Sequence, residues 1–292
     1  MKLVTFRVDD AWRLGVVRDL NVVGVSVAVS SAYSPLRSFL LGGSREFERV
    51  NEEAEAKFEN GHDVQQLDGL VLAPPVPDPE KVLCVGFNYA DHASEMAVER
   101  PSAPDVFAKF RNSLIGSGDQ IVLPGVSTEI DYEGELAAVI GQRCRGVEAE
   151  HALRYVGGYT ILNDVTARDL QFRTSQWTLG KAVDTFAPVG PVLTTADEIP
   201  DPQSLDLTTR VNGEVLQQSS TGAMIFSVAQ IIAAVSAVMT LEPGDIISTG
   251  TPSGVGWKRV PPRFLSAGDV VEVEISGIGI LRNEVVNGHS EE

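Results

Sequence analysis

Three acidic residues near the middle of the chain have the spacing of a metal site. Glu133 and Glu135 stand two apart before an apolar run at 136–141, and side chains at i and i+2 of a strand point to the same face. Two adjacent carboxylates repel each other and need a cation or a proton between them. Asp164 ends a second apolar, strand-like run and is the expected third ligand. Such an all-oxygen set suits Mg²⁺ or Mn²⁺, with Ca²⁺ able to substitute, and does not suit zinc.

Other classes of protein also place acids in this way. Charge runs in acidic proteins usually form a solvated strand face, but the apolar residues 136–141 predict a buried strand directly after the pair. A non-catalytic β domain with a structural Ca²⁺ is a second alternative, which a site filled by protein oxygens and without a nearby base would favour. A glycosidase is a weaker third, because its carboxylates flank a sugar bond at roughly 5–10 Å, and Glu133 and Glu135 are too crowded for that.

A candidate general base lies in the segment 86–95, GFNYADHASE. His92 and Glu95 are three apart and share a face if the segment is helical, so the carboxylate can orient the imidazole and raise its basicity. Taken alone, a histidine of this kind is more often a surface or capping residue. Its place after an apolar strand favours catalysis, because loops set on scaffolds carry function. We expect the segment 88–100 to be a lid that is mobile without ligand and helical when closed.

Composition limits the size, the partners and the compartment. The 292 residues, 43% of them hydrophobic, can bury a full core in one large and one small domain. The net charge of −17 argues against binding to nucleic acid or to anionic membranes. Two cysteines are too few for a disulfide framework and no signal-peptide pattern opens the chain, so a cytoplasmic enzyme is expected. The uncharged stretch 221–241 is interrupted by polar residues and predicts a buried amphipathic helix, not a membrane span.

Prolines divide the chain near residue 75. Residues 1–40 alternate in short apolar pieces typical of a small β-rich unit, and a polar helix is predicted from about 45 to 62. Residues 73–79 contain four prolines and are expected to form an extended linker or edge. The predicted domains are therefore 1–75 and 76–292.

The larger domain has the pattern of an α+β, β-rich fold. Gly-Asp turns that lead into strands recur at 118, 244 and 268. Only a few helices are expected, near 148–154, 166–176 and 225–240, and this favours a mixed or antiparallel β roll over a doubly wound sheet. GxGxxG, P-loop, GxSxG and HExxH motifs are absent from the sequence.

An ordered series of motifs from about Lys81 to Val286 resembles the fumarylacetoacetate hydrolase family, in its branch of acylpyruvate hydrolases and oxaloacetate decarboxylases. In chain order the motifs are KVLCVGFNYADHASEM, PDVFAKF, DYEGELAAVIG, GYTILNDVTARDLQ, LGKAVDTFAPVGP, VNGEVLQ, LEPGDIISTGTPSGVG and GDVVEVEISGIGILRNEV. The series is specific for the family, though not for the reaction. The resemblance implies a mixed β-sandwich roll as the catalytic domain, here after a small N-terminal α/β domain, and a homodimer.

The resemblance also implies roles for individual residues. The metal carboxylates fall on Glu133, Glu135 and Asp164, the lid pair on His92 and Glu95, the substrate contacts on Arg168, Gln171, Thr251 and Tyr89, and the active-site lysine on Lys181. The structural alternatives are an ion pair of Arg168 with Asp164 or Asp169, a surface position for Lys181, and a turn role for Thr251.

The reaction that the resemblance implies is metal-dependent chemistry on a 2-oxo or 2,4-dioxo carboxylic acid. Hydrolytic C–C cleavage of an acylpyruvate through a metal-stabilised enolate is the first expectation, with His92 activating water and Lys181 stabilising the oxyanion or delivering a proton. Decarboxylation or tautomerisation of oxaloacetate, or isomerisation of 2-hydroxyhepta-2,4-diene-1,7-dioate, are alternatives at the same site. Val85 and Asn88 stand where fumarylacetoacetate hydrolase itself carries a further carboxylate ligand, which argues against fumarylacetoacetate as the substrate.

Overall fold

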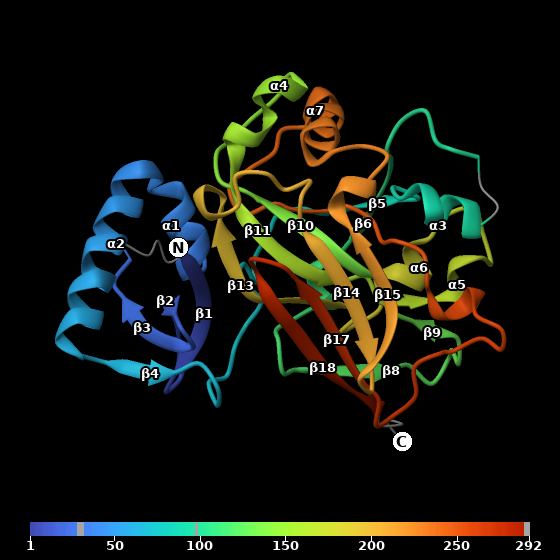
Figure 1. Ribbon diagram of the computed structural model, residues 1–292, viewed down its shortest axis with the longest axis horizontal. Helices are drawn as coiled ribbons and strands as arrows, with labels where there is room; N and C mark the ends of the chain where they lie inside the picture. Colours follow the sequence, from blue (N-terminus) through green and yellow to red (C-terminus); the bar gives the residue numbers. More distant parts are fainter. Residues whose placement is uncertain (28–31, 97–98, 289–292) are drawn as a thin grey trace.

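The computed structural model describes residues 1–27, 32–96 and 99–288 (Figure 1). Residues 2–27 and 32–66 form a small α/β unit, drawn in blue, whose antiparallel strands and two helices are β1 (Lys2–Val8), β2 (Ala11–Arg18), β3 (Asn21–Val25), α1 (Pro35–Leu41), α2 (Gly43–Asn60) and β4 (Val64–Gln66). The predicted polar helix is α2. The strand pattern of residues 1–40 misses α1, which forms because Ser34 accepts a hydrogen bond from the Arg37 N–H at its start and Pro35 suits the first turn.

A single mixed sheet joins this unit to the rest of the chain. Among the described residues, eleven strands form it in the order β4-β3-β2-β1-β13-β11-β10-β16-β5-β6, with β7 paired to β13. Its later strands are β5 (Val82–Gly86), β6 (Asp105–Lys109), β7 (Leu114–Ile115), β10 (Gly134–Ile140), β11 (Val156–Asn163), β13 (Ala187–Thr195) and β16 (Ile246–Ser248). Lys2 of β1 lies opposite Thr194 of β13. The domain boundary at residue 75 stays a prediction, and it falls between two parts of one sheet.

The segment 73–79, predicted to be an extended linker or edge, is packed against β1. Ala73 and Val76 are buried. The Ala73 N–H donates to the Thr5 carbonyl at 2.9 Å, and the Thr5 hydroxyl donates to the Pro75 carbonyl at 2.7 Å. Proline lacks an N–H but keeps its carbonyl. The Thr5 hydroxyl of β1 therefore supplies the hydrogen bond that the Pro75 carbonyl would otherwise receive from a neighbouring strand.

A second sheet packs face to face on the first. In the part of the chain that is described it has five strands in the order β15-β14-β17-β18-β8, with bounds β8 (Gln120–Leu123), β14 (Asp206–Val211), β15 (Glu214–Ser220), β17 (Val270–Ile275) and β18 (Gly279–Asn287). Strands β14, β17 and β18 lie against β10, β11 and β13, and Leu136, Leu207 and Val273 belong to the core between the sheets. The predicted β-rich α+β roll is confirmed.

The three Gly-Asp turns share one conformation. Gly118, Gly244 and Gly268 have φ angles of 91°, 92° and 91°, a left-handed region that glycine adopts without a Cβ penalty. The aspartate after each glycine accepts a hydrogen bond at 2.8 Å from the N–H three residues earlier. The turns lead into β8, β16 and β17, as their sequence predicts.

The remaining elements are short and stand at the edges of the sheets. They are α3 (Ala90–Glu95), α4 (Ala149–Ala152), α5 (Arg168–Gln171), α6 (Thr178–Lys181) and α7 (Val228–Val238), the strands β9 (Ile130–Asp131) and β12 (Thr166–Ala167), and 3₁₀ turns at Arg111–Ser113, Leu153–Tyr155, Ala196–Glu198, Thr221–Ala223 and Gly256–Lys258. The predicted helix at 221–241 is shorter than expected, because the capping box of Ser227 and Gln230 starts α7 only at Val228. None of the described helices has the length and apolarity needed to cross a membrane.

Candidate active site

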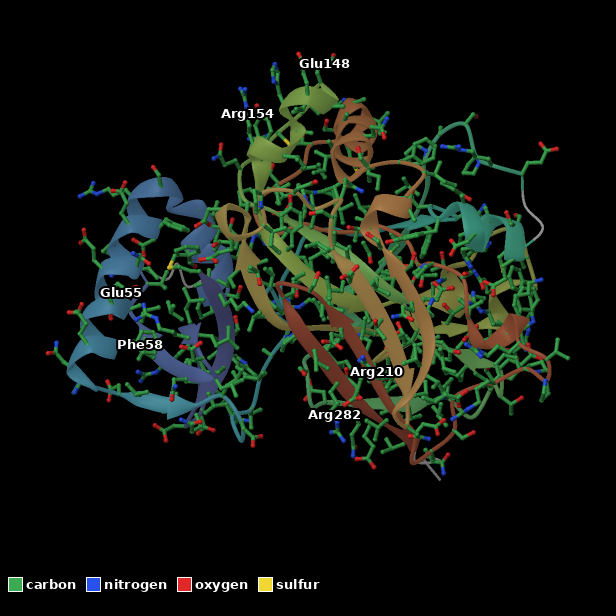
Figure 2. The ribbon with its side chains drawn as sticks, viewed as in Figure 1. Glu55, Phe58, Glu148, Arg154, Arg210 and Arg282 are labelled. Carbon is green, nitrogen blue, oxygen red and sulfur yellow. The ribbon has the colours of Figure 1, made fainter. Side chains whose placement is uncertain are left out.

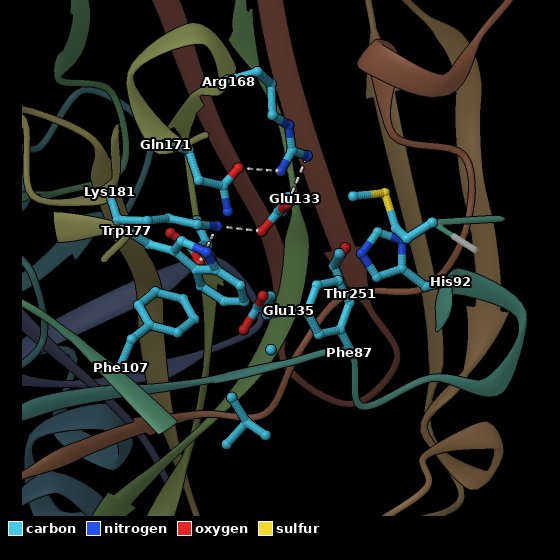
Figure 3. A pocket seen from close by; sticks show the side chains of 14 residues that line it. Phe87, His92, Phe107, Glu133, Glu135, Arg168, Gln171, Trp177, Lys181 and Thr251 are labelled. Carbon is cyan, nitrogen blue, oxygen red and sulfur yellow. Dashed lines mark hydrogen bonds and ion pairs between the residues drawn. The ribbon is translucent and has the colours of Figure 1, made fainter. Parts of the chain in front are cut away.

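One cavity brings together most of the predicted site residues (Figure 3). It encloses about 330 Å³ including its open mouth. The predicted residues that line it are His92, Glu133, Glu135, Asp164, Arg168, Gln171, Lys181 and Thr251. Glu95 lies outside the lining but contacts His92. Tyr89 is fully buried, does not line the cavity, and its backbone bridges Met224 instead.

The three acids converge because β10 and β11 pair as neighbours. Gly134 lies opposite Asn163 in their antiparallel register, which places Glu133 and Asp164 side by side just outside the ladder, where the Asp164 N–H donates to the Glu133 carbonyl at 2.8 Å. Glu135 is the second residue of β10. One oxygen of each acid lies within 4.8 Å of the other two, and all three side chains are buried.

Two buried lysines compensate the charge of these acids. Lys181 Nζ lies 2.7 Å from Glu133 Oε2 and 2.8 Å from Asp164 Oδ2. Lys109 Nζ lies 2.6 Å from Asp164 Oδ1 and donates to the Val165 carbonyl at 3.0 Å. The surface alternative for Lys181 is therefore wrong. The sequence analysis did not predict a role for Lys109. A signal was present, because Lys109 ends the strand β6 after three apolar residues, and a lysine that is buried at such a position needs an acidic partner.

Arg168 is held by different partners from those that helix spacing suggests. Its Nη2 lies 2.9 Å from Asp131 Oδ2 and 2.6 Å from Glu133 Oε1, and its Nη1 donates to Gln171 at 3.1 Å. The expected alternatives, Asp164 and Asp169, are not its partners. Helix α5 begins at Arg168 itself. Its side chain therefore turns back toward Asp131 of β9 and Glu133 just before β10, and does not run along the helix.

Asp131 anchors this arginine from outside the cavity. Its carboxylate accepts hydrogen bonds from the backbone N–H groups of Tyr132 at 2.9 Å, Gly256 at 2.7 Å and Trp257 at 3.0 Å. Asp131 is fully buried, and these three backbone donors hold its carboxylate in one position. Arg168 therefore links a rigid acid on one side to the candidate ligand Glu133 on the other.

Burial and neighbouring charges separate the pKa values of the two glutamates. For Glu133, burial acts to raise the pKa, but the cations of Lys181 and Arg168 outweigh it and bring the pKa to about 2. For Glu135, burial together with the negative charges of Asp164 and Glu133 raises the pKa well above the usual range. The pKa values of two acids that stand two apart in the sequence thus shift in opposite directions, because the cations lie on the Glu133 side of the cluster.

The acid triad fits a hard divalent cation. Its donors are carboxylate oxygens alone, which Mg²⁺, Mn²⁺ and Ca²⁺ prefer. Glu135 accepts hydrogen bonds from Ser248 at 2.5 Å and from Gly250 at 2.9 Å, both at Oε2. Its other oxygen, Oε1, is therefore left to coordinate a metal. Three protein ligands beside a cavity do not complete the six to eight oxygens of a closed Ca²⁺ cage. This geometry favours a reactive site over the structural-cation alternative.

The helix α3 covers the cavity through its histidine and its acids. His92 Nδ1 lies 3.1 Å from Glu95 Oε2, as the spacing predicts, and Glu95 Oε1 accepts a hydrogen bond from the Gly254 N–H at 3.0 Å. Asp91 accepts from the Ser253 hydroxyl at 2.7 Å. These contacts join α3 to the turn after β16, and His92 is only 4% exposed. Of the expected lid, residues 97–98 lie outside the described part of the chain, and its mobility stays a prediction.

Thr251 lies both in the predicted turn and in the wall of the cavity. It follows Gly250, whose φ is 94°, and its hydroxyl donates to the Gly134 carbonyl at 3.0 Å and accepts from Gln217 at 2.7 Å. Its side chain also lines the cavity beside Glu135. Three aromatic residues, Phe87, Phe107 and Trp177, line the cavity as well and were not predicted.

The chain is similar to known proteins in both sequence and structure. The family model described as "Fumarylacetoacetate (FAA) hydrolase C-terminal" matches residues 81–286. The chain is 41% identical over 293 residues to the oxaloacetate tautomerase fahd2, mitochondrial, of Xenopus laevis, which covers 98% of this chain and 90% of that protein. The structure of fumarylacetoacetate hydrolase from Exiguobacterium antarcticum matches 99% of this chain and 100% of its own, with 40% identity and a TM-score of 0.85. Maleylpyruvate hydrolase from Sphingobium sp. SYK-6, in complex with manganese(II) ion and pyruvate, matches the same shares with 34% identity and a TM-score of 0.82.

Proposed function

The chain belongs to the fumarylacetoacetate hydrolase family, and we propose that it is a divalent-metal-dependent enzyme that interconverts the keto and enol forms of oxaloacetate or a similarly short 2-oxo acid. The observation that carries the proposal is a single small cavity with the acid triad between two proton-carrying groups, His92 on one side and Lys181 on the other (Figure 3). The name of the similar Xenopus laevis protein, an oxaloacetate tautomerase, supports the same reaction.

Glu133, Glu135 and Asp164 would hold the metal. When bound, the metal polarises a 2-oxo group and stabilises negative charge on its oxygen. Arg168 and Gln171 form the wall beside Glu133. Because Arg168 is already paired with two carboxylates, we assign it mainly to fixing Glu133, and only secondarily to the substrate contact that the sequence predicts.

The proton transfer follows from the positions of His92 and Lys181. Glu95 occupies the Nδ1 side of the imidazole, so Nε2 is the atom that takes a proton from carbon 3 of the substrate. The electron pair of that C–H bond becomes the carbon 2–carbon 3 double bond, and the former carbonyl oxygen takes up a proton from the Lys181 ammonium. The reverse transfers regenerate the ketone. The pKa of Lys181 is raised because Asp164 and Glu133 outweigh the burial that opposes its charge, so the lysine carries a proton, and its place in the cavity wall makes it the donor that we assign.

Hydrolysis of a short acylpyruvate is a second candidate for the same site. The His92–Glu95 pair has the geometry of a base that activates water, and the similar Sphingobium protein is named a maleylpyruvate hydrolase. In this reaction water attacks the distal carbonyl, the bond between the acyl carbon and carbon 3 breaks, and its electron pair leaves as the enolate of pyruvate, which then takes up a proton. Val85 lines the cavity, so no further carboxylate is present there to support fumarylacetoacetate as the substrate.

The proposal is tested by following the ultraviolet absorbance of the oxaloacetate enol with purified protein, with Mg²⁺ or Mn²⁺ and after chelation. Activity should require the metal, and Glu135→Gln should abolish both activity and metal binding measured by calorimetry. Glu148→Gln is the matched control, because Glu148 is an exposed glutamate at the start of α4 (Figure 2) and does not line the cavity. Metal affinity retained in Glu135→Gln would contradict the ligand assignment. Full activity after chelation would contradict the metal dependence.

A second assay separates the two candidate reactions. Pyruvate release from short acylpyruvates is measured in parallel with oxaloacetate enolisation. Enolisation without pyruvate release supports the tautomerase, and pyruvate release at a comparable kcat/KM supports the hydrolase. Inactivity in both assays with metal present would contradict the proposal as a whole.

We also propose a compartment and an assembly. Cys84 and Cys144 are free and buried, which suits the reducing conditions of the cytoplasm, and the homodimer is carried over from the family. Both stay predictions, to be checked by fractionation of cells and by light scattering of the purified protein.

A further inference from the structure

The residue between β5 and the helix α3 has a strained backbone. Phe87 has a φ of 53°, a left-handed conformation that bulky residues rarely adopt because the Cβ crowds the following carbonyl. Phe87 follows the last residue of β5 directly and lies three residues before α3 begins. Backbone strain of this kind persists only where the surroundings enforce it, and it concentrates at functional sites.

The next residue, Asn88, supplies that enforcement. Its side-chain amide donates to the Thr249 carbonyl at 2.7 Å and to the Phe226 carbonyl at 3.0 Å, and its Oδ1 accepts from the Phe226 N–H at 2.8 Å. Its own carbonyl accepts from the Ile225 N–H at 2.6 Å. Asn88 is fully buried. Four hydrogen bonds to two distant segments therefore fix the chain immediately after Phe87.

The strained backbone directs the Phe87 ring into the cavity, against the imidazole. The ring centroids of Phe87 and His92 lie 6.1 Å apart with an angle of 23° between their planes. On its other side the Phe87 ring meets Trp177 edge to face at 5.4 Å, and Trp177 in turn meets Phe107 at 5.2 Å. Figure 3 shows these rings around the acids. The aromatic chain thus connects α3 to the N-cap of α6, the helix that carries Lys181.

We propose that Phe87 is a positioning residue for His92: its enforced left-handed backbone places its ring on the imidazole, so that Phe87 and Glu95 together fix the imidazole over the cavity. The assignment of His92 as the base rests on the proposed function. Glu95 determines the direction of Nδ1 through one hydrogen bond, but a single bond leaves the ring free to rotate about it. The stacked Phe87 ring removes that freedom, and Trp177 holds Phe87 from behind.

Two substitutions at Phe87 test the proposal in the full-length protein. Phe87→Leu removes the aromatic face, and it should lower kcat by roughly 10- to 100-fold with KM within about twofold, since misplacing a catalytic group costs turnover more than binding. Phe87→Tyr keeps the aromatic ring and should retain most of the wild-type kcat. Phe87→Leu should also speed hydrogen exchange in residues 89–95, because α3 loses a contact that holds it against the cavity. Wild-type kcat and exchange in Phe87→Leu would overturn the proposal.

Phe58→Leu is the matched control. Phe58 is also half-buried, but it lies on α2 in the N-terminal unit (Figure 2), where it packs under Arg18. This variant should leave kcat and the exchange of residues 89–95 unchanged. If Phe87→Leu speeds exchange throughout the chain as much as in α3, Phe87 is a general core residue and the proposal fails. If the wild-type protein has no activity, the proposed function fails by itself. The role of Phe87 is still tested in that case, because the exchange rates of Phe87→Leu and Phe58→Leu show whether Phe87 holds α3 against the cavity.

A pair of small residues isolates the backbone strain. Phe87→Gly and Phe87→Ala both remove the ring, but only alanine keeps the unfavourable φ. The glycine variant should therefore melt at a higher temperature than the alanine variant, the reverse of the usual order in regular structure. A lower melting temperature for the glycine variant would show that the backbone at Phe87 is not strained and would overturn its part in directing the ring.

Discussion

Replacing Arg168 with methionine is expected to destabilise the protein as well as the site. The guanidinium is 1% exposed and lies within 3 Å of both Asp131 and Glu133. Methionine fills much of the arginine stem but supplies no charge. Asp131 and Glu133 would then stay buried without their shared cation, and removing one partner of a buried ion pair is far more costly than removing the whole pair.

The size of the effect follows from what each acid retains. Asp131 keeps three backbone N–H donors, and Glu133 keeps the Lys181 ammonium at 2.7 Å. The loss should therefore fall near the lower end of the usual range for a broken buried pair, about 3 kcal/mol. At about 2–4 °C per kcal/mol for a large domain, the melting temperature should fall by roughly 6–12 °C.

The assay is thermal unfolding followed by circular dichroism at pH 7 in metal-free buffer. Arg210→Met is the control, because Arg210 forms an ion pair at 2.7 Å with Glu274 on the open face of the second sheet (Figure 2), and surface pairs contribute at most about 1 kcal/mol. The argument is refuted if the two variants melt within about 2 °C of each other, which corresponds to about 1 kcal/mol or less between them.

Three further predictions concern the acids, the base and the lid. In metal-free protein, Glu133→Gln should lower the melting temperature at pH 7, because the lowered pKa of Glu133 stabilises the fold above about pH 4.5 and that stability is lost as the pH falls toward 2. Glu135→Gln should raise the melting temperature at pH 7, because a raised carboxyl pKa stabilises the fold only at low pH, and this stability is lost as the pH rises through the folded-state pKa. Melting temperatures are measured from pH 2 to 8. If both variants change the melting temperature at pH 7 in the same direction, the opposite pKa shifts of Glu133 and Glu135 are contradicted. His92→Ala should lower kcat by roughly 10²- to 10⁴-fold with little change in KM, in steady-state kinetics of enolisation, and unchanged kcat would make His92 structural. Hydrogen exchange in residues 88–96 should slow when oxalate is added with Mg²⁺, and equal protection in both states would contradict a mobile lid.

The acid triad was predictable because it depends on local pattern. Continuous apolar runs predict where β10 and β11 lie, and the acids at the ends of these runs are expected at the edge of the buried region. Pairing of neighbouring strands along the chain then brings Glu133 and Asp164 together. The His92–Glu95 contact was predictable for the same reason, since helical spacing alone places both side chains on one face.

The partners of Arg168 and the role of Lys109 depend on contacts between distant segments. Asp131 lies 37 residues before Arg168, and Lys109 lies 55 residues before Asp164. Sequence spacing carries no information at such separations. Phe87 was missed for another reason: its function depends on a positive φ, and an ordinary aromatic residue gives no sign of this where glycine or asparagine would.

The buried charges around the cavity indicate an order of binding. Among the described residues, the cluster contains four carboxylates, Asp131, Glu133, Glu135 and Asp164, and three cations, Lys109, Lys181 and Arg168. One excess negative charge is costly in a buried site, and burial together with the charges of Asp164 and Glu133 raises the pKa of Glu135. A bound divalent cation would change this excess of one negative charge into an excess of one positive charge, and only then is the carboxylate of a 2-oxo acid attracted. Oxalate without Mg²⁺ should accordingly leave lid exchange unchanged, because the anion meets a cavity without excess positive charge.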